Sequence, residues 1–180
     1  IDIPTMLADA KAARAAGAQI VAVAVHAGDE YVQLPNAQQR SVATALAQSG
    51  LVDLIYGHHV HVVQPIDKIG DVWVAYGMGN LIHKQHTAAA RAATQAEALA
   101  TFTFTEGADG RFHATAAEAR PVAMASTTEP LLHTIDLPTL LADKSLTGAR
   151  RTAYQAVYDR SVKALLALGA DTKGLTVVKP

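Results

Sequence analysis

The sequence contains no cysteine. This absence excludes disulfide bonds, thiolate nucleophiles and zinc–thiolate sites, so any chemistry must come from histidine, carboxylate and amide side chains. Charged residues are few, at 17% of the chain, and the formal net charge is −1. Because the chain has neither an excess nor a cluster of Lys and Arg, we expect no nucleic-acid partner.

Long apolar runs are also missing, and the first residues do not form a signal peptide, so we expect no membrane span in this chain. Half of the residues are apolar, which is the balance of a folded globular protein. A length of 180 residues suits one domain with a sizeable core. Because the chain starts at Ile1 without a methionine, we interpret residues 1–180 as a single domain whose N-terminal part is missing.

The first third of the chain alternates between helical and extended patterns. Two short, β-branched apolar runs, residues 18–25 and 52–56, predict buried strands. Residues 5–15 have helical spacing closed by Gly17, and a second helix is predicted to run to Gln48 with Asn36 as its N-cap. This alternation is typical of a parallel sheet with right-handed crossovers, so the fold class is α/β.

After Pro65 the pattern becomes antiparallel. Residues 66–69 and 72–76 predict a hairpin, and residues 98–105 and 112–122 predict two further strands. An amphipathic helix is expected over residues 149–168, with a last strand at 175–178. The sequence therefore predicts parallel αβ units followed by antiparallel strands and a C-terminal helix.

Histidines gather where the two predicted parallel strands end. His26 follows the first strand, and His58, His59 and His61 follow the second. The carboxyl ends of parallel strands meet at one edge of the sheet, where α/β folds keep their ligands. Imidazole is the commonest metal ligand, and residues two apart on an extended segment project to the same side. We therefore expect His26, His59 and His61 to form a metal site, with His58 pointing away to orient a ligand or contact substrate.

Other polar residues near these strand ends have two interpretations each. Asp29 and Glu30 suit a role beside the ligands or as a general base. Asn80 either binds metal through its amide oxygen or holds a glycine-rich turn. Tyr31 and Gln39 suit substrate binding, although Gln39 also suits a solvated helix position. His83 and His86 suit the same rim or an ordinary loop, and His113 and His133 are interpreted as structural.

Four segments, taken in order, resemble the bacterial CapA family of capsule-synthesis or poly-γ-glutamate-biosynthesis proteins, which are related to calcineurin-like metallophosphatases. The segments are HAGDEY at 26–31, QR at 39–40, GHHVHVVQPI at 57–66 and YGMGNL at 76–81. Typical motifs of that family are His-Trp-Gly-x-Glu-Tyr, Gly-x-His-Pro-His-Val-x-Gln and Ser-x-Gly-Asn-Phe. The resemblance spans about residues 1–105.

The resemblance implies a role for individual residues. His26, His59 and His61 match the metal-ligand histidines, Glu30 the motif glutamate and Asn80 the motif asparagine. With His58, the last two are the expected catalytic residues. The departures from the family motifs are changes of packing or turn residues that leave the ligand set intact: Ala27 for Trp, Val60 for Pro, Gly77 for Ser and Leu81 for Phe.

The resemblance also implies the C-terminal half of a calcineurin-like metallophosphatase sandwich. The family's first half, with its Asp and Asn ligands, precedes the equivalent of Ile1. The implied cofactors are divalent ions (Mn, Fe or Zn), and the expected activity is metal-dependent hydrolysis or transfer on a phosphoester or an amide-linked anionic polymer. Expected partners are the missing N-terminal segment or a second copy, in an extracytoplasmic, envelope-associated setting. The alternative is a non-catalytic envelope protein of polymer assembly with a vestigial metal site.

Overall fold

The computed structural model describes residues 1–83, 94–125 and 133–180. Its first sheet has the strand order β1-β2-β4-β3, built from β1 (Ala22–His26), β2 (Leu54–His58), β3 (Ile66–Ile69) and β4 (Val72–Ala75). Strands β1, β2 and β4 are mutually parallel, and β3 runs antiparallel to β4. Within the described ranges β1 pairs with β2 alone, so it forms an edge of the sheet.

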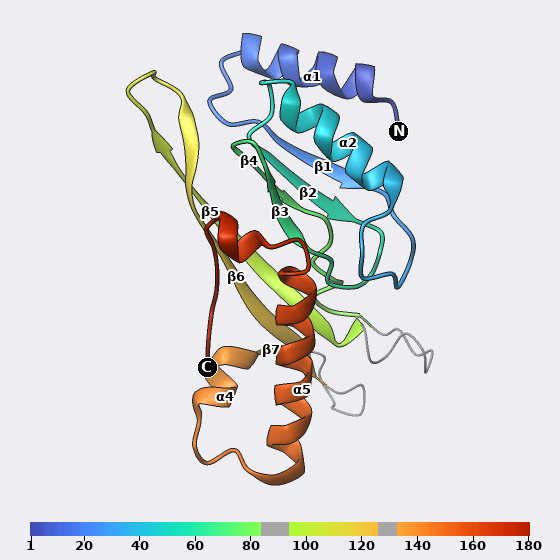
Figure 1. Ribbon diagram of the computed structural model, residues 1–180, viewed down its shortest axis with the longest axis vertical. Helices are drawn as coiled ribbons and strands as arrows, with labels where there is room; N and C mark the ends of the chain where they lie inside the picture. The colour runs from blue at the N-terminus through green and yellow to red at the C-terminus, as the bar shows by residue number, and fades with distance from the viewer. Residues whose placement is uncertain (84–93, 126–132) are drawn as a thin grey trace.

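Helices α1 (Ile3–Ala15) and α2 (Ala37–Gln48) cover one face of this sheet (Figure 1). The core beneath them includes Val25, Leu46 and Ile55. Helix α2 starts as predicted, because Asn36 accepts from the backbone N–H of Gln39 at 2.9 Å while the Gln39 side chain accepts from the Asn36 N–H at 3.0 Å. This reciprocal capping box satisfies two donors that a helix start otherwise leaves open.

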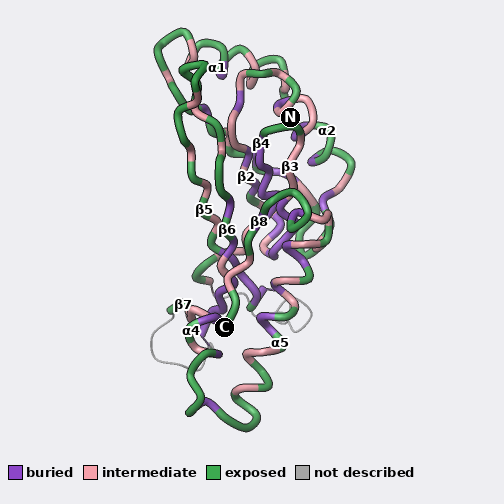
Figure 2. The backbone as a smooth tube through the Cα atoms, turned by 60° about the vertical axis from the view of Figure 1, so that its left-hand side comes forward, coloured by how far each residue is buried: buried purple, intermediate pink, exposed green. Residues whose placement is uncertain are grey.

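The second sheet consists mainly of a long antiparallel hairpin, β5 (Ala96–Glu106) and β6 (Phe112–Met124). The short strand β7 (Thr134–Asp136) extends it antiparallel to β6, and β8 (Leu175–Val177) pairs parallel with β6. The tip of the hairpin is exposed, whereas its base is buried (Figure 2).

The two sheets meet in a core formed by residues from both, among them Ile66 and Trp73 of the first and Ala119 of the second. The C-terminal helix α5 (Gly148–Leu165) adds Ala164 and Leu165 to this core and packs on the base of the hairpin beside α4 (Leu137–Ala142). The 3-10 turn η1 (Ala170–Lys173) leads into β8. The predicted fold class is confirmed: this is a mixed α/β structure compatible with a metallophosphatase-like sandwich.

The predicted elements differ from the structure mainly at their ends. Strand β1 starts at Ala22 rather than residue 18, and the strand predicted over residues 52–56 runs as β2 from Leu54 to His58. Strand β7 and helix α4 were not predicted, because elements of 3 and 6 residues are too short to show a clear periodicity. That residues 1–180 form one domain lacking an N-terminal part stays a prediction.

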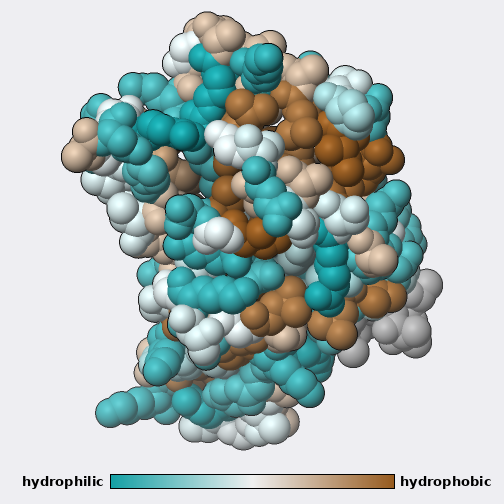
Figure 3. Space-filling view, turned by 45° about the horizontal axis from the view of Figure 1, so that its top comes forward, coloured by the Kyte–Doolittle hydropathy of each residue, from teal (hydrophilic) through white to brown (hydrophobic). Residues whose placement is uncertain are grey.

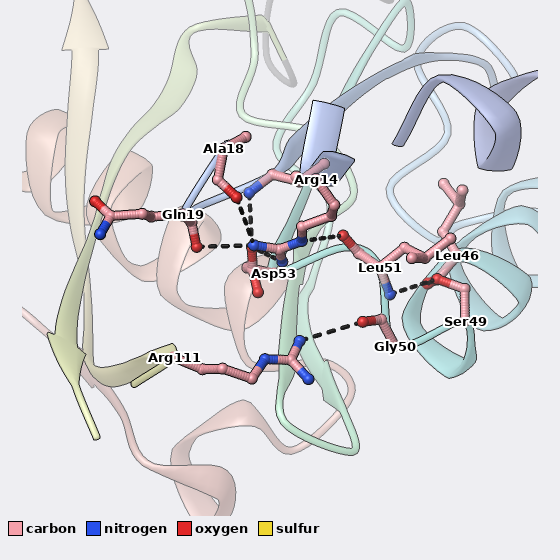
Figure 4. A network of polar contacts seen from close by, with 10 residues as sticks. Arg14, Ala18, Gln19, Leu46, Ser49, Gly50, Leu51, Asp53 and Arg111 are labelled. Carbon is pink, nitrogen blue, oxygen red and sulfur yellow. Dashed lines mark hydrogen bonds and ion pairs between the residues drawn. The ribbon is translucent and has the colours of Figure 1, made fainter. Parts of the chain in front are cut away.

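A polar network around Arg14 and Asp53 fixes the amino ends of the strands (Figure 4). The histidines lie at the opposite, carboxyl ends of β1 and β2. Arg14, near the end of α1, donates to the carbonyls of Leu51 at 3.1 Å and Gln19 at 2.8 Å and forms an ion pair with Asp53. Asp53 also accepts from the backbone N–H of Val21 at 2.6 Å. One guanidinium therefore ties α1 to the starts of both β1 and β2.

Replacing Arg14 with Met is expected to lower the free energy of unfolding by about 2–3 kcal/mol, because the Asp53 carboxylate and the three carbonyls that Arg14 contacts lose a charged donor. Urea denaturation measures this change. The control is Arg111→Met, since Arg111 is exposed and, among the described residues, its guanidinium makes one hydrogen bond, to the Gly50 carbonyl at 3.2 Å. Loss of this bond should change stability by less than about 0.5 kcal/mol. Equal losses from both variants would contradict the assigned role of Arg14.

Candidate functional site

The predicted site residues gather at the carboxyl ends of β1 and β2. His26 and His58 end these strands and are register partners in the parallel pair. A pocket of about 350 Å³ opens there. It is lined by the histidines and by a glycine-rich turn after β4: His26, Gly57, His58, His59, Val60, His61, Gly77, Met78, Gly79 and Asn80. The strand ends therefore bring together the four histidines singled out in the sequence.

The backbone after β2 differs from the predicted extended segment. Strand β2 ends at His58, and both His59 (φ 95°) and His61 (φ 61°) have left-handed backbone conformations. Val60 between them is 1% exposed and is turned into the core. The expected alternation along a strand was therefore wrong in its geometry, although both rings reach the same pocket. Left-handed φ at a non-glycine residue costs free energy and is frequent at functional sites.

The ring separations show which histidines suit a common ion. With metal–nitrogen distances of about 2.0–2.1 Å, two imidazoles on one ion have ring centroids about 4.5–5.2 Å apart in neighbouring coordination positions and about 6.4 Å apart in opposite positions. The centroids of His26 and His59 are 4.8 Å apart, whereas those of His59 and His61 are 6.3 Å apart. In the described ranges, no three His, Asp or Glu side chains form a group that could hold a metal ion. The 4.8 Å separation is compatible with one ion between His26 and His59, and metal ligation by each of the three histidines stays a prediction.

His61 is held from several sides. Its Nδ1 lies 2.6 Å from the Asn80 amide oxygen, which only accepts, so Nδ1–H donates and the neutral ring keeps its lone pair on Nε2. Nε2 lies 3.8 Å from a carboxylate oxygen of Glu30, and the Tyr31 ring stacks on the imidazole with centroids 5.8 Å apart. Three other predicted site residues, Glu30, Tyr31 and Asn80, therefore surround this histidine.

Gln39 lies below the site rather than in it. It is 4% exposed, and its amide donates to the Gln64 side-chain oxygen at 2.8 Å. Gln64 in turn donates to the Val32 carbonyl at 2.8 Å. Gly28 packs so closely that a Cβ would lie 2.8 Å from the Gln39 side chain. Gln39 thus supports the loop that carries Glu30 and Tyr31, and direct contact with substrate stays a prediction.

The remaining histidines differ in their surroundings. His58 is exposed, and its ring meets the ring of Tyr56 edge-on, with centroids 5.4 Å apart. His113 pairs with Asp109 at 3.0 Å beside the hairpin turn. His83, which suited the rim, is instead largely buried and donates from Nε2 to the Thr94 carbonyl at 2.8 Å. His86 lies outside the described residues.

One buried acid was not predicted from the sequence. Glu97 on β5 has a fully buried side chain, and burial raises its pKa to about 7. A glutamate between two buried alanines, Ala96 and Ala98, was the available signal, but Glu97 belongs to no recognised motif. It lies under the glycine-rich turn, because a Cβ on Gly79 would be 3.0 Å from the Glu97 Cγ.

Comparisons with known proteins agree with the motifs. Residues 1–85 match the family model described as "Bacterial capsule synthesis protein PGA_cap". The resemblance to the CapA family is confirmed. The chain is 36% identical over 98 residues to "PGA biosynthesis protein CapA" of Bacillus subtilis (strain 168), covering 54% of this chain and 24% of that protein. It is 34% identical over 79 residues to "Capsule biosynthesis protein CapA" of Bacillus anthracis, covering 44% and 19%.

The matched CapA segment contains every site residue predicted from the sequence, from His26 to Asn80. The alignments span a quarter or less of the length of these two relatives. Among the helices the structure describes, none is both long and apolar enough to cross a membrane.

Proposed function

We propose that this chain carries part of the metal centre of a CapA-like protein that performs hydrolysis or transfer during capsule or poly-γ-glutamate biosynthesis. The observation that carries the proposal is the pairing of His26 with His59, at 4.8 Å between ring centroids, in a pocket also lined by His61 and Asn80. These residues lie in the segment that matches the capsule-synthesis family.

The contacts of each residue around the pocket suggest a different chemical role for it. His26 and His59 would hold a divalent ion (Mn, Fe or Zn); when bound, such an ion lowers the pKa of a water molecule and offsets charge on an oxyanion. Glu30, half-exposed and close to His61, suits a base that accepts a proton. Asn80 fixes the tautomer of His61, and exposed His58 at the rim suits proton transfer to a leaving group.

Two imidazoles do not complete the coordination of a hard divalent ion. The proposal therefore assigns the remaining oxygen ligands to another segment of a longer parent protein or to a second copy of the chain. Strand β1 offers a place for this addition, because within the described ranges its outer edge is unpaired and His26 stands at its end. An unpaired strand edge readily accepts another strand.

The substrate proposal rests on the charge that the site would handle. An ion with two neutral histidine ligands keeps its positive charge and favours an anionic group, such as a phosphoester or the carboxylates of an amide-linked polymer. Apolar side chains also reach the surface between hydrophilic ones (Figure 3). Near Glu30 and Asn80 in the chain, the exposed apolar or aromatic residues are Tyr31, Val32, Leu81 and Ile82. We further propose an extracytoplasmic, envelope-associated setting, in keeping with the names of the two relatives.

A second candidate function is non-catalytic polymer assembly with a vestigial site. It is favoured by the described residues, among which no three His, Asp or Glu side chains form a group that could hold a metal ion. The test uses the parent-length protein with added Mn²⁺, measuring metal content, hydrolysis of p-nitrophenyl phosphate and cleavage or transfer of poly-γ-glutamate. Metal-dependent turnover of either substrate supports the enzyme. A folded protein that retains no metal and turns over neither substrate supports the assembly role.

A further inference from the structure

Glu97 is a buried acid that has no role in the proposed chemistry. Its side chain is fully buried, and neither carboxyl oxygen has a hydrogen bond of ordinary geometry within the described residues. Burying such a group costs several kcal/mol unless nearby donors compensate. Because burying this carboxyl group costs free energy, we expect Glu97 to have a role other than filling the core.

The groups nearest the Glu97 carboxyl include several from the segment that follows β4. The Gly79 backbone packs on its aliphatic stem, since a Cβ at Gly79 would lie 3.0 Å from the Glu97 Cγ. The backbone N–H groups of Asn80 and Leu81 face the carboxylate and favour its charged form. The Nε2 atom of His83 lies 3.5 Å from Oε1. Glu97 therefore contacts four of the five residues from Gly79 to His83.

This segment is strained and carries a site residue. Gly79 (φ 83°) and Leu81 (φ 64°) have left-handed backbone conformations on either side of Asn80. The Asn80 amide oxygen reaches the Nδ1 of His61, which is also left-handed. Two strained segments thus meet at one hydrogen bond, and such conformations persist only where their surroundings hold them.

We propose that Glu97 is a positioning residue: packed against the Gly79 backbone, with its carboxylate facing the segment from Asn80 to His83, it holds the glycine-rich turn so that Asn80 fixes the His61 ring. The inference rests on the proposed function only in that His61 belongs to that site. Glu97 does not touch the pocket itself, because it acts from the second sheet through the backbone of the turn. The sheet interface thereby takes part in arranging the carboxyl ends of the first sheet.

The test measures the His61 ring directly in metal-free protein, by long-range ¹H–¹⁵N NMR of the imidazole. The wild-type protein should show the Nδ1–H tautomer for neutral His61. Glu97→Ala should lose this pattern, as should Asn80→Ala, and Glu97→Ala should add nothing in the Asn80→Ala background, because both act through one contact. Glu97→Gln keeps an oxygen acceptor and should restore the wild-type pattern.

Val122→Ala is the matched control. Val122 is the cross-strand partner of Glu97 and is equally buried, but it offers no acceptor; its truncation should lower stability and leave the His61 spectrum unchanged. If Glu97→Ala does not fold, Glu97→Asp, which draws the carboxylate back by one methylene, should shift the His61 signals. A folded Glu97→Ala or Glu97→Asp variant with a wild-type His61 spectrum, or an equal shift in Val122→Ala, would overturn the inference. The NMR measurement needs neither bound metal nor catalytic turnover. It therefore tests the role of Glu97 even if the protein has no hydrolytic or transfer activity.

Discussion

Replacing His59 with glycine is expected to weaken divalent-metal binding by more than about 100-fold, because loss of a direct ligand should exceed the 10- to 100-fold effect of its outer partners. The same substitution should raise the free energy of unfolding by about 1 kcal/mol, because glycine adopts the left-handed conformation of His59 (φ 95°) without strain. Metal titration and urea denaturation of the same samples measure both changes.

The opposite signs of these two effects make the prediction specific. If a residue serves only the fold, truncating it lowers the protein's free energy of unfolding. Truncating His59 should instead raise the free energy of unfolding while weakening metal binding. His113→Ala is the control, since His113 pairs with Asp109 beside the hairpin turn and lies outside the pocket lining; metal affinity should not change. Unchanged metal binding in His59→Gly would show that His59 is not a ligand.

Glu97→Gln is expected to make the protein more stable above neutral pH, by roughly 3 kcal/mol at pH 8, with the difference disappearing near pH 4.5. Burial raises the pKa of Glu97 from 4.5 to about 7. Between these values the folded protein holds a proton that the unfolded chain has released, so wild-type stability falls as pH rises through this window. The difference between these two pKa values corresponds to roughly 3 kcal/mol.

The measurement is the free energy of unfolding from urea curves at several pH values. Glutamine removes the titration while keeping the shape of the side chain, so the difference between variant and wild type should grow from pH 4.5 to pH 7 and then level off. Glu118→Gln on β6 is the control, because Glu118 is exposed and should leave the pH dependence unchanged. A constant difference across the range would mean that Glu97 does not titrate in this window.

The sequence predicted the parts of the fold that depend on local patterns. The N-cap at Asn36, the two αβ units and the long hairpin follow from spacing and turn residues, and all are present. The histidines were expected at one sheet edge because parallel strands end together, and His26 and His58 are indeed register partners. Short elements such as β7 and α4 depend on tertiary packing, so no periodicity marked them.

The details of the site were less predictable. The left-handed backbone at His59 and His61 carries no sequence signal, because histidine gives no hint of positive φ as glycine does. The support of the site by Glu97 depends on contact between two sheets, and Glu97 lies 17 residues after Asn80 in the chain. The burial of Gln39 was similarly hidden, because its partner Gln64 is 25 residues away.

The central claim is that His26 and His59 share one metal ion. Zn²⁺ titration followed by NMR of the histidine rings tests it most directly, because each imidazole reports its own binding. The account predicts that His26 and His59 shift together at the lowest metal concentrations and with one apparent affinity, while His113 and His133 stay unchanged. Parallel shifts of all the histidines, or a His113 shift at lower Zn²⁺ concentrations than those that shift His26 and His59, would contradict it.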